Sequence, residues 1–180
     1  MSDNWPPKGD YERWTPLSSF KPAWNDRTDI LRVLIPNEAR TILEFGAGTC
    51  YLKTLLAPHQ VYTPSDLVSR GPGTIVKDLN ETPYDFIDGQ YDVIVLSGVF
   101  EYILPIVEFI PYLAAITETV ICSYANTMYD VNFSISQGWV NFFRQKEFVQ
   151  MFKEAGFAHI YTRSWKDQSL YIFGPQKVRE

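Results

Sequence analysis

The sequence has little cysteine and little histidine. Among its 180 residues, the only cysteines are Cys50 and Cys122, and the only histidines are His59 and His159. Two cysteines at these positions suit a reducing compartment better than a disulfide framework, so we expect a cytoplasmic protein. The two histidines are far apart and provide no zinc-binding spacing, so we expect no bound metal.

Runs of basic residues and long apolar stretches are also missing. The 16 Lys and Arg residues and 21 Asp and Glu residues give a net charge of −5. Without a cluster of Lys and Arg to follow phosphates, we expect no nucleic-acid partner. Residues 103–116 form the longest apolar stretch, but it is interrupted by Pro105, Glu108 and Pro111 and is too short to span a bilayer. The N-terminus lacks a secretory pattern, so we expect no membrane association.

Aromatic residues, by contrast, make up 16% of the chain. Residues 1–25 contain three of the five tryptophans and four of the twelve prolines, which predicts an N-terminal arm with little regular structure. This arm would either cover a binding site or pack on the surface of the domain. Residues 26–180 fit one domain, because a domain usually has roughly 100–200 residues.

Strand and helix patterns alternate over residues 26–174. Apolar runs predict strands over residues 41–45, 60–65, 74–77, 91–96 and 119–124. Helical spacing predicts helices over residues 26–35, 51–56, 105–116 and 148–155. Residues 158–165 and 168–174 should form a terminal antiparallel pair of strands. This alternation predicts an α/β fold with a mostly parallel sheet.

Residues suited to ligand binding stand at the ends of successive predicted strands. They are Glu44, Asp66, Asp78 and the pair Ser97-Gly98. Ligands of parallel sheets bind beyond the carboxyl ends of the strands, where the chain order reverses, so we expect these residues to share one site. For Asp78 the alternative is that it caps a turn with Asn80.

The first predicted strand leads into a glycine turn with the sequence Glu44-Phe45-Gly46-Ala47-Gly48-Thr49-Cys50. Its two glycines let the main chain approach a ligand closely, and the following helix offers unpaired N–H groups. A dinucleotide motif would have a third glycine where Tyr51 stands, and Glu44 would repel a pyrophosphate. The same carboxylate suits a ligand with an amino group, which favours the amino-acid end of S-adenosylmethionine.

The glycine turn resembles the first motif of class I S-adenosylmethionine-dependent methyltransferases, with Cys50 in place of the last glycine. Residues 96–103 are similar to the fourth motif of the small-molecule enzymes in this family. Residues 91–156 resemble bacterial methyltransferases of small metabolites and polysaccharide precursors. The resemblance covers residues 41–174 and implies a Rossmann-like three-layer sandwich, a seven-stranded sheet and S-adenosylmethionine as cofactor.

The resemblance also implies a role for each position that matches the family. The implied cofactor-binding residues are Glu44, Gly46, Ala47 and Gly48 for the methionyl end, Asp66 for the ribose, Leu67, Asp78 and Leu79 for the adenine, and Ser97, Gly98 and Val99 opposite the turn.

Methyl transfer to a hydroxyl group is helped by a general base, and the candidates near the strand ends are Glu101, Tyr102 and Tyr124, of which Glu101 is preferred. Glu101 could instead be a surface carboxylate or a loop cap. Tyr102 and the aromatic, amide-rich segment 126–144, which includes Asn126 and Trp139, are expected to bind the acceptor. Alternatively, this segment is a packed surface loop or a dimer contact.

We therefore expect a methyltransferase that acts on a small-molecule acceptor, such as a sugar or another hydroxyl-bearing metabolite. Two other classes remain open. One is a module of the same fold that binds the cofactor without catalysis, and the less favoured one is a nicotinamide-dependent enzyme.

Overall fold

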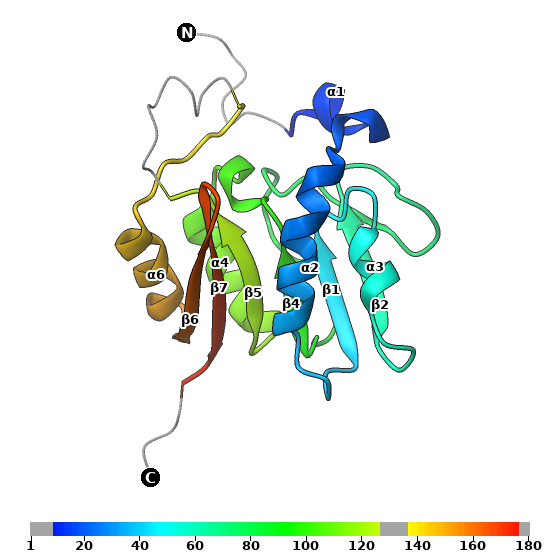
Figure 1. Ribbon diagram of the computed structural model, residues 1–180. Helices are drawn as coiled ribbons and strands as arrows, with labels where there is room; N and C mark the ends of the chain where they lie inside the picture. Colours follow the sequence, from blue (N-terminus) through cyan, green and yellow to red (C-terminus); the bar gives the residue numbers. More distant parts are fainter. Residues whose placement is uncertain (1–8, 127–136, 177–180) are drawn as a thin grey trace, which may run out of the picture.

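The computed structural model describes residues 9–126 and 137–176 (Figure 1). Seven strands form one sheet in the order β3-β2-β1-β4-β5-β7-β6. The strands are β1 (Thr41–Phe45), β2 (Val61–Asp66), β3 (Ile75–Val76), β4 (Val93–Leu96), β5 (Val120–Tyr124), β6 (Phe157–Trp165) and β7 (Gln168–Pro175). Strands β3, β2, β1, β4 and β5 are parallel, whereas β7 pairs antiparallel with both β5 and β6.

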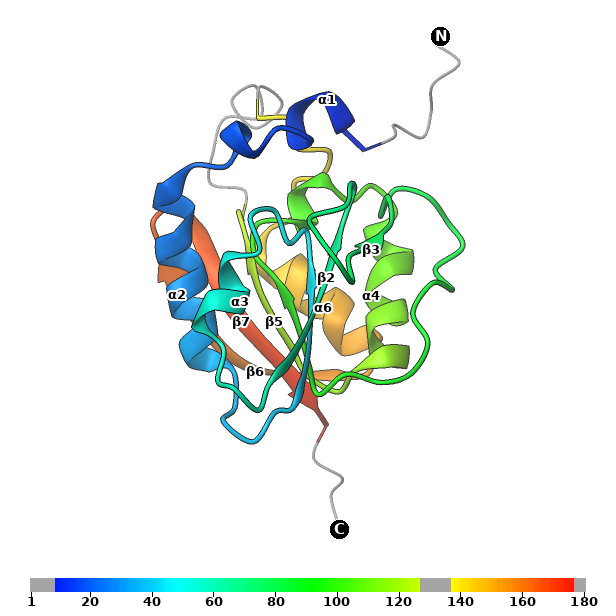
Figure 2. The same ribbon diagram turned by 90° about the vertical axis from the view of Figure 1, so that its right-hand side faces the viewer.

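Helices cover both faces of this sheet (Figures 1 and 2). The longer helices are α2 (Asn25–Leu34), α4 (Ile106–Ile116) and α6 (Gln145–Glu154), and the shorter ones are α1 (Tyr11–Trp14) and α3 (Tyr51–Leu55). Helices α2 and α3 pack on one face, and α4 and α6 pack on the other. The arrangement confirms the predicted three-layer sandwich with a mostly parallel sheet and a terminal antiparallel pair.

The alternation of side chains along each strand divides the apolar core into two layers. In β1, Ile42 packs with Leu31 of α2 and Leu52 of α3. Its neighbour Leu43 points to the opposite face and packs with the cluster that contains Phe109 of α4 and Phe148 of α6. Both faces of β1 are therefore covered, which agrees with the apolar side chains of Ile42, Leu43 and Phe45.

The chain order reverses at β1, which lies between β2 and β4. Open parallel sheets bind their ligands at such a switch point, beyond the carboxyl ends of the strands. In this protein those ends carry the glycine turn after β1 and Ser97 after β4. The topology therefore places the predicted site at this edge.

The N-terminal arm is more regular than its sequence suggests. Besides α1, it contains two short 3-10 helices, η1 (Leu17–Ser19) and η2 (Pro22–Trp24). Residues 1–8 of the predicted arm and residues 127–136 of the predicted acceptor-binding segment lie outside the described residues. The division of the chain at residue 25 stays a prediction. Every helix within the described residues is too short or too polar to cross a lipid bilayer.

Candidate cofactor and acceptor site

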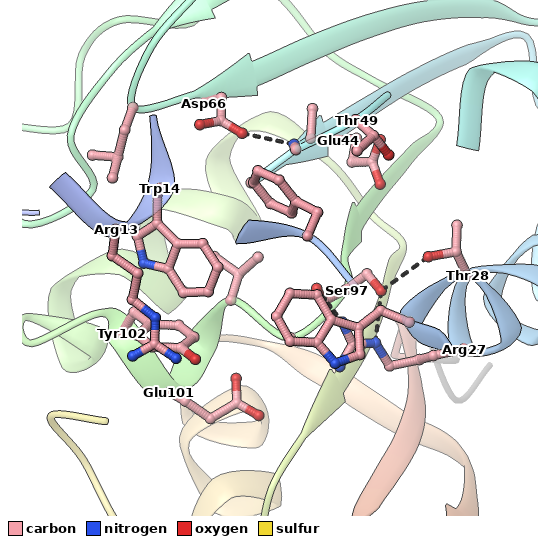
Figure 3. A pocket seen from close by; sticks show the side chains of 18 of the residues that line it. Arg13, Trp14, Arg27, Thr28, Glu44, Thr49, Asp66, Ser97, Glu101 and Tyr102 are labelled. Atoms are coloured by element: carbon pink, nitrogen blue, oxygen red, sulfur yellow. Dashed lines mark hydrogen bonds between the residues drawn. The ribbon is translucent and has the colours of Figure 1, made fainter. Parts of the chain in front are cut away.

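A cavity of about 640 Å³ lies where the chain order reverses. It is lined by the glycine turn, the ends of β2 and β4, a third 3-10 helix η3 (Phe100–Tyr102), the N-terminal arm and the turn between β6 and β7. Figure 3 shows Glu44 and Asp66 on one side of the cavity and Glu101 on the other. We call the side with Glu44 and Asp66 the first half of the cavity and the side with Glu101 the second half.

Glu44, near the end of β1, lies in the first half. Only 4% of the residue is exposed, and its carboxyl group accepts a hydrogen bond from the hydroxyl of Tyr62. Burial, with a smaller contribution from the nearby charge of Asp66, raises the pKa of Glu44 to about 8, against the opposing effects of the Tyr62 hydrogen bond and of the charge of Arg27. Glu44 is therefore a buried acid that lacks a cationic partner in direct contact among the described residues.

The glycine turn needs glycine for two separate reasons. Gly46 and Gly48 have φ angles of 66° and 54°, which are unfavourable for residues with a Cβ atom. A Cβ atom on Gly46 would also lie 2.5 Å from Cγ2 of Val99, and one on Gly48 would lie 2.6 Å from the ring of Phe20. Cys50 has φ 55°, so the residue that replaces the family's last glycine occupies the same strained region.

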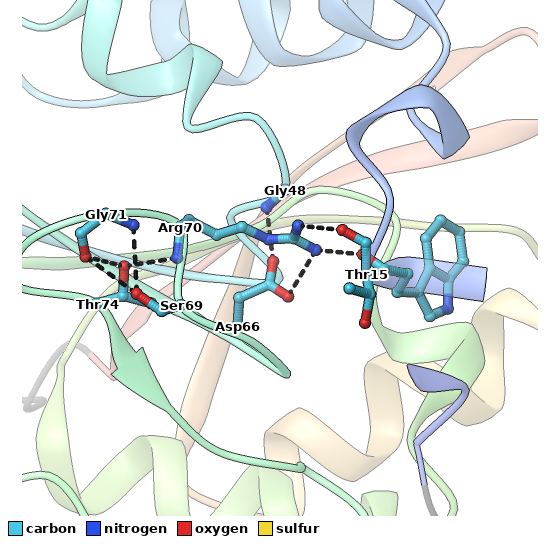
Figure 4. Close-up of polar contacts among 8 residues, drawn as sticks. Thr15, Gly48, Asp66, Ser69, Arg70, Gly71 and Thr74 are labelled. Carbon is cyan, nitrogen blue, oxygen red and sulfur yellow. Dashed lines mark hydrogen bonds and ion pairs between the residues drawn. The ribbon is translucent and has the colours of Figure 1, made fainter. Parts of the chain in front are cut away.

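Asp66, the last residue of β2, connects the glycine turn to the arm (Figure 4). Its carboxylate accepts a hydrogen bond of 2.7 Å from the backbone N–H of Gly48 and forms an ion pair of 3.1 Å with Arg70. The Arg70 guanidinium also donates to the carbonyl oxygens of Trp14 and Thr15 in the arm. The position expected to bind the ribose is thus linked to the segment that covers the cavity.

Asp78 caps a turn with Asn80, which is the alternative to ligand binding that the sequence left open. Its carboxylate accepts hydrogen bonds from the backbone N–H groups of Asn80, at 2.9 Å, and of Gly9, at 2.6 Å. Asp78 does not line the cavity, whereas Leu67 and Leu79 do. The adenine-binding role of these three residues stays a prediction.

Ser97, Gly98 and Val99 line the cavity, and their role in binding the cofactor stays a prediction. The side chain of Arg27, from α2, lies across Gly98, where a Cβ atom would be 2.6 Å from the guanidinium nitrogens. Arg27 donates from Nε to the hydroxyl of Ser97 at 2.9 Å and from a terminal nitrogen to the Ser97 carbonyl at 3.0 Å. Glycine at position 98 therefore makes room for a buried arginine.

Glu101 lies on the second side of the cavity and is only 1% exposed, so it is not a surface carboxylate. Its Oε1 accepts a 2.8 Å hydrogen bond from the N–H of Ala125 and a 3.2 Å hydrogen bond from Nε2 of Gln168. Its Oε2 is buried and has no hydrogen-bond partner among the described residues. Burial raises the pKa of Glu101, while the charge of Arg27 opposes this shift.

The other expected catalytic and substrate-binding residues are divided between the cavity and the core. Tyr102 and Trp139 line the cavity. Tyr124 instead lies in the core, where its ring stacks on Phe148 with centroids 4.3 Å apart and its hydroxyl donates to Asn141. Tyr124 therefore does not reach the cavity.

Asn126 does not line the cavity either. Its side-chain amide donates a 2.7 Å hydrogen bond to the hydroxyl of Ser169 and accepts one of the same length from Tyr171. Asn126 therefore joins the end of β5 to β7. Among the described residues, no group of three or more His, Cys, Asp or Glu side chains could hold a metal ion.

Sequence reasoning missed Arg27 and Gln168. The signal for Arg27 is its spacing, because it stands four residues before the buried Leu31 and so shares the apolar face of α2. A charged residue on that face must find a buried partner. Gln168 offers no comparable signal. It is the first residue of β7, directly after the β6–β7 turn, where a polar residue is ordinary.

Comparisons with known proteins agree with this geometry. Residues 24–162 match the model of a family described as a methyltransferase domain. No curated protein matches the chain in sequence.

Several solved structures share the fold. A putative O-methyltransferase from Nostoc punctiforme has a TM-score of 0.75 and 14% identity over 97% of this chain and 63% of its own. An O-methyltransferase family protein from Burkholderia thailandensis has a TM-score of 0.71 and 16% identity over 88% of this chain, which spans 58% of that structure's length. Magnesium protoporphyrin IX methyltransferase from Synechocystis, with bound S-adenosylhomocysteine, has a TM-score of 0.65 and 14% identity over 92% of this chain and 94% of its own.

The family match covers more than half of the chain, and it agrees with the glycine turn, the switch point and the cavity lined by the predicted strand ends. The chain therefore belongs to the methyltransferase domain family, as its resemblance to S-adenosylmethionine-dependent methyltransferases predicts.

Proposed function

We propose that the protein transfers the methyl group of S-adenosylmethionine to a hydroxyl oxygen of a small acceptor, with Glu101 as the general base. The observation that carries this proposal is that Glu101 lines the cavity and that its buried Oε2 atom has no hydrogen-bond partner among the described residues. Buried polar atoms are normally paired, so an unpaired carboxylate oxygen in a cavity suits a ligand that donates a hydrogen bond.

The first half of the cavity fits the cofactor. S-adenosylmethionine carries an ammonium group and ribose hydroxyls, and the buried carboxyl groups of Glu44 and Asp66 can accept hydrogen bonds from both kinds of donor. Ser65 also lines the cavity, and its buried hydroxyl has no hydrogen-bond partner among the described residues. Gly46 and Gly48 allow the main chain to approach the amino-acid end.

The second half fits an acceptor with a ring and a hydroxyl group. Trp14, Tyr102 and Trp139 line the cavity, and Tyr102, which follows Glu101 in η3, contacts both Trp14 and Trp139. Their ring faces can pack against the apolar face of a sugar or of a planar ring, which places the acceptor's polar edge toward the carboxylate. We therefore include sugars and other hydroxyl-bearing metabolites in the proposed acceptor class.

The chain's residues have two tasks in this reaction. When bound, S-adenosylmethionine supplies a methyl group on a positively charged sulfur. The walls of the cavity align the acceptor oxygen with this methyl group, and such alignment can provide a large part of the rate. Glu101 takes the hydroxyl proton on Oε2 as the new oxygen–carbon bond forms and the carbon–sulfur bond breaks, with the bonding electrons staying on sulfur.

Calorimetry with S-adenosylmethionine and S-adenosylhomocysteine tests the cofactor half. We expect Asp66→Ala and Gly46→Trp to weaken the binding of both compounds at least about 10-fold. Asp66→Ala removes a hydrogen-bonding carboxylate, and Gly46→Trp fills the glycine turn with a large side chain. Asp88→Ala, which removes an exposed carboxylate away from the cavity, is the matched control and should bind like the natural protein. Unchanged binding by both site variants would refute this assignment.

The acceptor half is tested with sugars, phenols and amines as separate groups of candidate acceptors, with S-adenosylhomocysteine formation as the readout. We expect turnover with a hydroxyl acceptor and at least a 100-fold lower kcat in Glu101→Gln, which keeps the shape but cannot accept the proton. Turnover only with amines would contradict the proposed acceptor class. Binding of S-adenosylmethionine without turnover of any acceptor would favour a cofactor-binding module.

A further inference from the structure

A chain of hydrogen bonds links the cofactor-facing end of β4 to Glu101. It begins at Ser97, passes through the guanidinium of Arg27 and the side-chain amide of Gln168, and ends at Oε1 of Glu101. Arg27 and Gln168 are 141 residues apart in the sequence, yet they meet at 2.8 Å beside the cavity. We call this chain the Arg27–Gln168–Glu101 relay.

The position of Arg27 is fixed at several points. Its Nε and one terminal nitrogen donate to Ser97, and its other terminal nitrogen donates to Oε1 of Gln168. The residue is only 8% exposed, and the guanidinium lies over Gly98, where any side chain would collide with it. Burial lowers the pKa of Arg27, and the charges of nearby acidic groups, Glu101 first, oppose this shift. A buried guanidinium of this kind stays charged.

Gln168 can connect Arg27 to Glu101 in only one orientation. A guanidinium has donors and no acceptors, and a carboxylate has acceptors and no donors. The amide oxygen must therefore face Arg27 and the amide nitrogen must face Glu101, as the structure shows. Gln168 thus holds Oε1 of Glu101, whereas Oε2 is left without a hydrogen-bond partner among the described residues.

The electrostatic surroundings of Glu101 come from four elements. Burial raises the pKa of Glu101, the positive charge of Arg27 lowers it, and the negative charge of Asp167 raises it. The charged and titratable groups that face it are Arg27 from α2, Asp167 from the β6–β7 turn, Tyr102 from η3, and Cys122 and Tyr124 from β5. Arg27 is the only cation among them, and together with hydrogen bonds from the backbone N–H groups of Glu101 and Ala125 it favours the charged, proton-accepting form of Glu101.

We propose that Arg27 and Gln168 are positioning residues that hold Oε1 of Glu101, so that Oε2 faces the acceptor as the proton-accepting atom. This inference rests on the proposed function for its catalytic meaning.

NMR titration tests the relay without cofactor or acceptor. Protein labelled with 13C at the carboxyl carbon of glutamate gives one signal for each Glu residue, and Glu101→Gln identifies the signal of Glu101. Gln168→Leu removes the amide of the relay, and Gln150→Leu makes the same change on the exposed face of α6 as the matched control. Arg27→Met and Gln168→Glu are the additional variants.

We expect the pKa of Glu101 to rise by about one unit or more in Gln168→Leu and in Arg27→Met, because the carboxylate loses a donor or a cation. Gln168→Glu should raise it at least as much, since two carboxyl groups would then share the site. Gln150→Leu should leave it unchanged. If Arg27→Met fails to fold, the two Gln168 variants decide. An unchanged pKa of Glu101 in both Gln168 variants would overturn the relay.

The catalytic meaning of the relay has its own test, with the hydroxyl acceptor found above. We expect Gln168→Leu to lower kcat and to move the acidic limb of the pH profile to higher pH, by the same amount as the pKa of Glu101. A lower kcat with an unmoved pH profile would overturn the positioning role. Absence of S-adenosylmethionine binding by the natural protein would refute the proposed function, whereas the NMR titration would still decide whether the relay exists.

Discussion

At the scale of single residues, two buried carboxyl groups beside the glycine turn have very different surroundings. Asp66 contacts the guanidinium of Arg70 and the N–H of Gly48, both of which stabilise a negative charge. Glu44 contacts the hydroxyl of Tyr62, and burial raises the pKa of Glu44 to about 8. At neutral pH, Glu44 therefore carries a proton in most molecules.

The raised pKa of Glu44 predicts a pH dependence of stability. In the unfolded chain a Glu titrates near about 4.3, so between that pH and about 8 the folded state binds the proton more tightly. The stability that the protonated Glu44 contributes is fully present below the pKa of the unfolded state, and it is lost as the pH rises through the pKa of the folded state. Burial of the charged carboxylate above pH 8 therefore lowers the free energy of unfolding, by an amount of the order of a few kcal/mol.

Glu44→Gln removes this titration while keeping an oxygen that can accept from Tyr62. We expect urea unfolding between pH 5.5 and 8.5 to show a free energy that falls with pH more steeply in the natural protein than in Glu44→Gln. If the free energy of unfolding depends on pH in the same way in both proteins, the pKa of Glu44 is not raised.

The limits of sequence reasoning at this scale are visible in Tyr124 and Asn126. Both stand at or just after the end of β5, where polar groups are expected to reach the site. The sequence predicts correctly that β5 ends at residue 124. The contacts across the sheet could not be predicted. Tyr124 points to the α6 side, and Asn126 is held by Tyr171 and Ser169 of β7, more than 40 residues away.

At the scale of elements, the strands and the main helices could be predicted because their apolar periodicity is strong. The arm could not, because its structure depends on tertiary contacts. Trp14 lies edge-on against Tyr102, with ring centroids 5.2 Å apart, and its carbonyl accepts from Arg70. Neither contact leaves a local pattern in residues 9–24, so the sequence indicated only that the arm either covers a site or packs on the surface.

Arg70 joins the arm to Asp66 at the end of β2, and its side chain is only 3% exposed. We expect Arg70→Met to release the arm, because the carbonyl oxygens of Trp14 and Thr15 lose their donor. Trypsin should then cleave after Arg13 at least several-fold faster than in the natural protein. Arg163→Met, a change on the exposed side of β6, is the control and should leave this cleavage rate unchanged. Equal rates in Arg70→Met and the natural protein would show that Arg70 does not hold the arm.

At the scale of the whole molecule, the stability of the sheet depends on one aromatic cluster between the sheet and helices α4 and α6. Phe148 is fully buried there and contacts the rings of Tyr124, Phe152 and Tyr171. Phe148→Ala should lower the free energy of unfolding by about 3–5 kcal/mol, since the cavity left by a large ring collapses only in part. Val107→Ala, at a position that is 66% exposed on α4, should change it by less than about 0.5 kcal/mol. Urea denaturation measures both, and similar losses in the two variants would contradict this account of the core.

The position of the arm has a consequence for the timing of turnover. Residues from Gly9 to Trp24 line the same cavity as the glycine turn and Glu101, so one segment borders both the cofactor half and the acceptor half. A ligand in either half is therefore enclosed by the same piece of chain. The residence times of the two ligands should then be coupled, and a change that frees the arm should shorten both together.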